Sequence, residues 1–165
     1  MKTRAATHGT LTGRWSELAA TLEHSGIDLC ALQETRWSGS KSRDIGRGFK
    51  VLYFGSPKIT NGVGVAVSER FCDSIVEVKR FNDRLMKVVV VTEERRLHFA
   101  TAFAPQTGCS DEVKEFWALH HKKTAEIPSE EMVVVARRSQ WSCRHIERWI
   151  QRPWRFRPRK TKRGR

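Results

Sequence analysis

Several features that would classify this chain at once are absent or scarce. The longest apolar runs, such as residues 88–91, are far too short to cross a bilayer, and residues 1–10 lack the apolar core of a signal peptide. The four cysteines form neither a CxxC pair nor a Cys/His cluster with zinc-ligand spacing; they are Cys30, Cys72, Cys109 and Cys143. We therefore expect an intracellular protein that is neither secreted nor embedded in a membrane.

Acidic residues are nearly absent from the last part of the chain. Up to Ala136 the sequence has 19 Lys and Arg residues against 17 Asp and Glu, whereas from Arg137 onward it has 12 against 1. The net charge of +13 therefore belongs mostly to residues 137–165. This basic, Trp-rich tail has no sustained hydrophobic period, so we expect it to be irregular or disordered. Residues 1–136 are long enough for one modest domain with a core.

The hydrophobic pattern of this body predicts a mixed α/β domain. Trp15, Leu18, Ala19 and Leu22 recur at helical spacing and predict a helix over residues 13–25. Ser110 is expected to begin a second helix. Apolar runs predict strands over residues 27–33, 49–54, 63–67, 72–80, 85–92, 97–104 and 132–136. This order implies an α/β domain with antiparallel strand pairing in the middle.

The first of these strands ends at Gln33-Glu34 and supplies the first candidate functional residue. It fixes the Glu34 carboxylate at the rim of a sheet, where α/β enzymes place ligand and catalytic groups. The alternative is an ordinary surface carboxylate paired with Arg36, which would contribute little stability. From the spacing alone we favour this alternative.

Five separated segments favour a ligand role for Glu34 over that of an ordinary surface carboxylate. They are GTLTGR at 9–14, LQETRW at 32–37, NGVGVAV at 61–67, DRLM at 83–86 and FAPQTG at 103–108. In this order they resemble the endonuclease/exonuclease/phosphatase superfamily. More narrowly, they resemble the endonuclease domain of non-LTR retrotransposon reverse transcriptases and the craniofacial development protein 2-like proteins.

The resemblance implies a four-layer α/β sandwich with two packed sheets and magnesium-dependent hydrolysis of a DNA phosphodiester. Mg²⁺ held by a carboxylate would neutralise charge on the phosphate and on the leaving oxygen. Glu34 matches the metal-ligand glutamate of the family and is the catalytic candidate. The resemblance also implies three substrate-binding candidates. The turn at Asn61 matches the loop that borders the family's nucleic-acid groove, and Gln106 stands where the family often has a phosphate-contacting Asn. Arg36 could reach a phosphate as a bidentate donor.

The sequence departs from the family at most other positions of the site. Thr7 stands where the family has a metal-site Asn, and Phe103 replaces the active-site Tyr. The family's Gly-Asp-x-Asn is replaced by residues 137–140, Arg-Arg-Ser-Gln, and the later segments with a further acid and a His have no counterpart. We therefore expect an incomplete sandwich, weak Mg²⁺ binding and no strong nuclease activity. Uncovered strand edges would favour association or aggregation, although the oligomeric state stays open.

The tail permits a second function. Its basic and aromatic residues could bind nucleic acid by neutralising phosphates and stacking on bases. The candidates are Arg144, Trp149, Arg152, Trp154 and Arg155. A nuclear location is a further possibility for an intracellular protein of this kind. The alternative, which we rank higher, is an unselected peptide. We hypothesise that residues from Arg137 onward are a frameshifted translation of a nuclease reading frame. The absence of a Gly-Asp-x-Asn segment from the other frames would refute this.

Overall fold

The computed structural model describes residues 1, 3–7, 14–57, 61–105 and 110–138. Nine strands and three helices follow one another along these residues. In chain order they are β1 (Thr3–Thr7), α1 (Trp15–His24), β2 (Leu29–Gln33), β3 (Gly39–Gly46), β4 (Phe49–Gly55), β5 (Val63–Ser68), α2 (Glu69–Cys72), β6 (Ile75–Asn82), β7 (Leu85–Val91), β8 (Arg96–Phe103), α3 (Ser110–Ala125) and β9 (Met132–Arg138).

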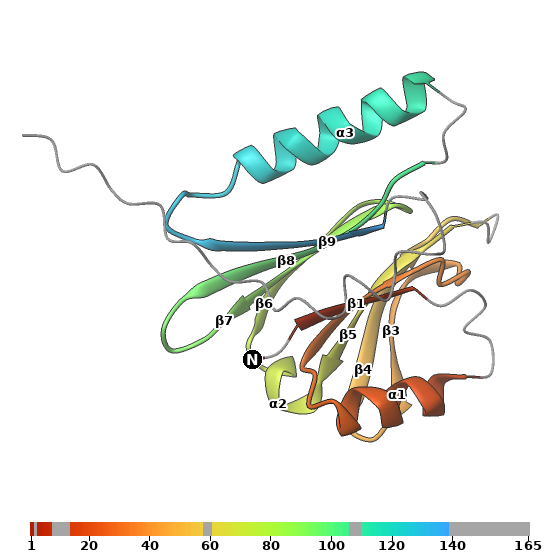
Figure 1. The fold of residues 1–165 in the computed structure, drawn as a ribbon, viewed down its shortest axis with the longest axis vertical. Helices are drawn as coiled ribbons and strands as arrows, with labels where there is room; N and C mark the ends of the chain where they lie inside the picture. The colour runs from red at the N-terminus through yellow and green to blue at the C-terminus, as the bar shows by residue number, and fades with distance from the viewer. Residues whose placement is uncertain (2, 8–13, 58–60, 106–109, 139–165) are drawn as a thin grey trace, which may run out of the picture.

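The strands form two sheets that pack face to face between two helices. One sheet has the order β1-β2-β5-β4-β3 and the other the order β6-β7-β8-β9. Among the described strands, β1 pairs with β2 and β8 with β9 in parallel, and the other neighbours are antiparallel. Helix α1 covers the outer face of the first sheet and α3 that of the second, which gives four layers (Figure 1). The predicted incomplete four-layer α/β sandwich is confirmed.

Three apolar clusters hold these layers together. The largest lies between the sheets, where β2, β5, β7 and β8 contribute fully buried Val, Leu, Met and Phe side chains. A second cluster joins α1 to the first sheet through Leu18, Ala19 and Leu22, the helical stripe seen in the sequence. The third joins α3 to the second sheet through Phe116 and Leu85. Strands β2, β5 and β7 are buried on both faces, which explains why their sequences are continuous apolar runs.

The structure differs from the predicted elements in four places. Strand β1 (Thr3–Thr7) is absent from the strands that the hydrophobic pattern predicted. Strand β3 was not predicted, because all but one of its residues are exposed and it has no apolar alternation. The strand expected over 72–80 begins only at Ile75, after the one-turn helix α2. The last strand continues two residues beyond the expected end at Ala136, to Arg138.

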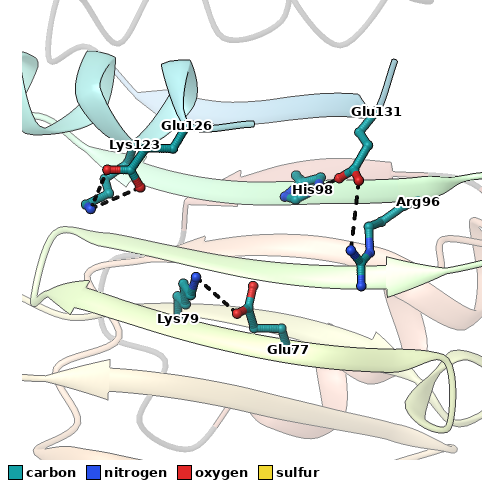
Figure 2. A network of polar contacts seen from close by, with 7 residues as sticks. All are labelled: Glu77, Lys79, Arg96, His98, Lys123, Glu126 and Glu131. Atoms are coloured by element: carbon teal, nitrogen blue, oxygen red, sulfur yellow. Dashed lines mark hydrogen bonds and ion pairs between the residues drawn. The ribbon is translucent and has the colours of Figure 1, made fainter. Parts of the chain in front are cut away.

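The outer face of the second sheet carries a polar network beside α3 (Figure 2). Lys79 pairs with Glu77 on β6 at 3.0 Å, and Lys123 pairs with Glu126 at 2.8 Å at the end of α3. Glu131 accepts a contact from His98 Nε2 and lies 3.8 Å from Arg96 Nη1, and so ties the start of β9 to β8. Within the described ranges, no helix combines the length and apolar character that a membrane span needs.

Candidate functional site

The ends of four strands meet at one edge of the sandwich. Thr7 and Gln33 are partners where β1 and β2 end, and Phe103 and Arg138 are partners where β8 and β9 end. The two pairs of strands belong to different sheets, and the buried Gln33 side chain connects them: its Nε2 donates to the Ala102 carbonyl at 3.0 Å and to the Ala136 carbonyl at 3.4 Å. The positions that the resemblance marks as functional are thus brought to a common edge.

The segment after β2 has an unusual backbone. Glu34 and Arg36 have φ values of 56° and 52°, in the left-handed region that residues with side chains rarely occupy. Such a conformation costs of order 1 kcal/mol per residue and persists only where the surroundings hold it. Here the Thr35 N–H donates to the Gly62 carbonyl at 3.2 Å, and the Arg36 N–H donates to the Asn61 carbonyl at 3.1 Å. Glu34 is half-buried, and Arg36 is exposed.

Gly62 lets this segment pack closely against the start of β5. A Cβ atom on Gly62 would lie 2.4 Å from Thr35 Oγ1, and the Gly62 φ of 123° also disfavours a side chain. The Thr35 side chain is buried, and within the described part of the chain its hydroxyl has no hydrogen-bond partner. The Asn61-Gly62 turn noted in the sequence is therefore the support on which the Glu34 segment rests.

The turn between β6 and β7 completes this junction. Asn61 Nδ2 donates to Asp83 Oδ2 at 3.0 Å, and the Gly62 N–H donates to the Asp83 carbonyl at 3.1 Å. The Arg84 carbonyl accepts from the Phe103 N–H at 2.8 Å, and the Arg84 guanidinium lies 3.6 Å from Glu112 of α3. The structure thus brings Glu34, Arg36 and Asn61 together. Gln33 and Asp83 lie in two of the segments that carry the resemblance, but the sequence does not mark them as site residues, because their contacts join different sheets.

The donor set at this edge does not fit a Mg²⁺ site. Glu34 supplies one carboxylate, whereas Mg²⁺ sites need near-octahedral oxygen coordination, usually with more than one fixed protein or substrate oxygen. At the positions that the resemblance pairs with further site residues, the chain has Thr7 and Arg138, and Gln140 lies outside the described residues. No group of three or more His, Cys, Asp or Glu residues that could hold a metal occurs among the described residues.

The remaining predicted site residues cannot be placed in this junction. They lie outside the described residues and are Gln106, Arg144, Trp149, Arg152, Trp154 and Arg155. Their assigned roles therefore stay predictions. Of the predicted site residues, Glu34, Arg36 and Asn61 are those that lie within the described part of the chain.

Comparisons with known proteins bear on the fold. No family model matches this chain, and no curated protein matches it. Among solved structures, it is similar to an endonuclease/exonuclease/phosphatase family protein from Leptotrichia buccalis, with a TM-score of 0.58 and 13% identity over 83% of this chain and 65% of that one. The chain has part of the endonuclease/exonuclease/phosphatase fold.

Two further solved structures share this endonuclease/exonuclease/phosphatase fold with the chain. D. rerio TDP2, complexed with a single-strand DNA product, has a TM-score of 0.58 and 12% identity over 81% of this chain and 58% of its own. The endonuclease domain of TRAS1, a telomere-specific non-LTR retrotransposon, has a TM-score of 0.56 and 12% identity over 81% of this chain and 57% of its own. The chain therefore spans between 57% and 65% of the length of these three structures.

Proposed function

We propose that this chain is a truncated, catalytically weak relative of magnesium-dependent DNA endonucleases of the retrotransposon type. The observation that carries the proposal is the composition of the strand-end edge. Its geometry suits an endonuclease/exonuclease/phosphatase site, yet Glu34 is the one carboxylate at the positions that match the family's catalytic set. DNA is the proposed ligand and the cell interior, including the nucleus, the proposed location.

The reaction itself explains why this composition is unfavourable. Hydrolysis of a phosphodiester needs a positioned water, a base for its proton and charge stabilisation on the phosphate and on the leaving oxygen. Arg138 stands where the resemblance expects the acid, and a guanidinium cannot take a proton from water. Phe103 offers no phenolic donor to the phosphate. We infer that this set of residues is poorly suited to cleaving a phosphodiester.

A nicking assay tests this proposal. Supercoiled plasmid incubated with the purified chain and Mg²⁺ should show no cleavage above the rate of a no-protein control. The matched variants are Glu34→Gln and Glu94→Gln, the latter at an exposed turn between β7 and β8. Robust nicking that Glu34→Gln abolishes and Glu94→Gln preserves would contradict the proposal and establish an enzyme.

A non-catalytic nucleic-acid binder acting through the tail is the second candidate. The separation of charge favours it, since residues 137–165 have 12 basic residues and 1 acidic residue. Deleting residues 139–165 removes most of this charge and leaves β9 whole. DNA binding that falls steeply between about 50 and 200 mM salt in the full chain, and is lost on deletion, would support this candidate. Binding that survives the deletion would place the contact on the body.

A further inference from the structure

Lys87 is the only charged residue of strand β7, whose other residues are apolar. Its side chain points to the outer face of the second sheet, because Leu85 packs beneath α3 and Met86 packs between the sheets. Lys79 on β6 lies opposite Lys87 on one side, and Ala100 on β8 lies opposite it on the other. An amine is thus placed within a largely apolar surface beneath α3.

The Lys87 side chain borders a small cavity between α3 and the second sheet. The apolar residues that line this cavity are Phe81, Leu85, Ala100, Ile127 and Val133. Lys87 is 8% exposed, and within the described part of the chain its amine has no hydrogen bond or ion pair. The amine is also not one of the fully buried polar atoms that lack a partner. The stem of Lys87 is therefore buried, while its amine reaches the opening of the cavity.

Two neighbouring lysines differ from Lys87 because each has a carboxylate partner (Figure 2). Lys79 lies 3.0 Å from Glu77 on the same strand. Lys123 of α3 lines the same cavity as Lys87 and lies 2.8 Å from Glu126. These ion pairs stabilise the charged form of the two amines, whereas Lys87 has no carboxylate at ion-pair distance among the described residues.

The surroundings of Lys87 favour a neutral amine. Burial lowers the pKa of Lys87, and the positive charge of Lys79 lowers it further. Three carboxylates act in the opposite direction, each to a smaller extent; they are Glu77, Glu126 and Glu131. His120 of α3 also lines the cavity. A lysine that is desolvated beside another cation is a nucleophile at neutral pH.

The charges beneath α3 balance without Lys87. Three carboxylates there each have a cationic partner, and the pairs are Glu77 with Lys79, Glu126 with Lys123, and Glu131 with Arg96. A protonated Lys87 adds an unbalanced positive charge to this network, and an anionic adduct would add a negative one. An amide adds no charge, because its nitrogen is not basic at neutral pH. The network therefore accommodates a neutral acyl adduct on Lys87.

We propose that Lys87 is an acylation site that accepts a small acyl group from an acyl phosphate or a thioester. The lone pair on Nζ attacks the carbonyl carbon and forms the amide bond. The bond from this carbon to the phosphate oxygen or the thiol sulfur breaks, and the leaving group departs with the electron pair. The proton lost from Nζ passes to water. The product is neutral, and its added carbon atoms lie beside the apolar walls of the cavity.

Acetylation of the full folded chain, mapped by peptide mass spectrometry, tests this proposal. With limiting acetyl phosphate at pH 7, Lys87 should be labelled about tenfold faster than Lys79 or Lys123. The same preference with acetyl coenzyme A would extend the donors to thioesters, whereas a preference with acetyl phosphate alone would restrict them to acyl phosphates. Equal labelling of the three lysines by both donors would overturn the proposal.

The same labelling in guanidinium chloride is the control for the fold. The preference for Lys87 should disappear there, because the unfolded chain has neither the burial nor the neighbouring cation. A preference that persists in the unfolded chain would show that the local sequence, and not the cavity, makes Lys87 reactive, and the proposal would then fail.

Substitution of Lys79 tests the effect of the neighbouring cation. Lys79→Met removes this charge and should lower the labelling rate of Lys87 several-fold. Lys79→Arg is the matched control, because it keeps the charge and should leave the rate unchanged. The Lys79 side chain is 50% exposed, so we expect both variants to fold, which circular dichroism checks. An unchanged rate in a folded Lys79→Met variant would contradict the proposed activation of Lys87.

Discussion

The junction at the strand ends and the polar layer under α3 are built in opposite ways. In the junction, polar groups are held by backbone contacts, as in the bonds from Gln33 to Ala102 and from Gly62 to Asp83, and a glycine is required by close packing. Under α3, the polar groups are side-chain ion pairs, several of them partly exposed (Figure 2). The geometry of the junction is therefore determined mainly by hydrogen bonds to backbone groups and by close backbone packing. Substitutions should cost more in the junction than under α3.

The largest effect should come from Gly62→Ala. The added Cβ would lie 2.4 Å from Thr35 Oγ1 and would require a φ of 123°. We expect the free energy of unfolding to fall by about 3 kcal/mol, measured by urea denaturation. Gly39→Ala is the control, because Gly39 has a φ of 87° but open space around it. An equal loss in both variants would show that backbone strain alone, and not the close packing, explains the glycine.

Gln33→Leu should be the next most damaging. It removes the donor that joins the two sheets at Ala102 and Ala136, and buried carbonyls lose a partner. We expect a loss of about 2 kcal/mol in the same denaturation experiment. Thr101→Val removes a longer buried contact, 3.4 Å from Thr101 Oγ1 to the Leu32 carbonyl, and should cost less. An unchanged free energy of unfolding in Gln33→Leu would contradict the view that this amide determines how the sheets meet.

Under α3, Glu131→Ala should have a moderate effect. It leaves the buried His98 without the contact at Nε2, and His98 Nδ1 has no hydrogen-bond partner within the described residues. We expect a loss of about 1 kcal/mol in thermal or urea denaturation. Glu126→Ala, which breaks an exposed pair with Lys123, should change stability little. If Glu131→Ala lowers the free energy of unfolding more than Gln33→Leu does, substitutions in the junction are not more destabilising than those under α3.

Lys87→Met should stabilise the protein slightly. Burial lowers the pKa of Lys87, as does Lys79, its partner across the strands, so the folded state disfavours the charged amine. The variant should gain about 1 kcal/mol at pH 7. Because the pKa is lower in the folded than in the unfolded state, the wild type gains stability as the pH rises toward the unfolded value of 10.5, and the advantage of the variant should shrink. Urea denaturation at pH 7 and pH 10 measures both effects.

Sequence patterns predicted some elements well and missed others for physical reasons. Helix α1 and strands β2, β5 and β7 were found because their buried faces require a helical stripe or a continuous apolar run. Strand β3 escaped prediction because its backbone pairs with β4 while nearly all its side chains face water. Backbone pairing without burial leaves no hydrophobic pattern to detect.

The candidate site was predicted in part. Glu34 and Arg36 were selected from one segment and Asn61 from another, and the structure places the two segments at one edge. The contribution of Asp83 and Gln33 depends on contacts between the sheets, over sequence separations that no local pattern records. The roles of the individual site residues stay predictions.

The sequence by itself determined the α/β class and the basic tail, because both follow from residue identity and local spacing. The departures from the family's site residues rest on the resemblance of five segments and stay predictions. Only the tertiary structure decided which strand ends meet and why Gly62 is required. Those properties arise from packing between segments that are distant along the chain. The position of Glu34 at the edge where four strand ends meet is a result of this packing, and its role as a metal ligand stays a prediction.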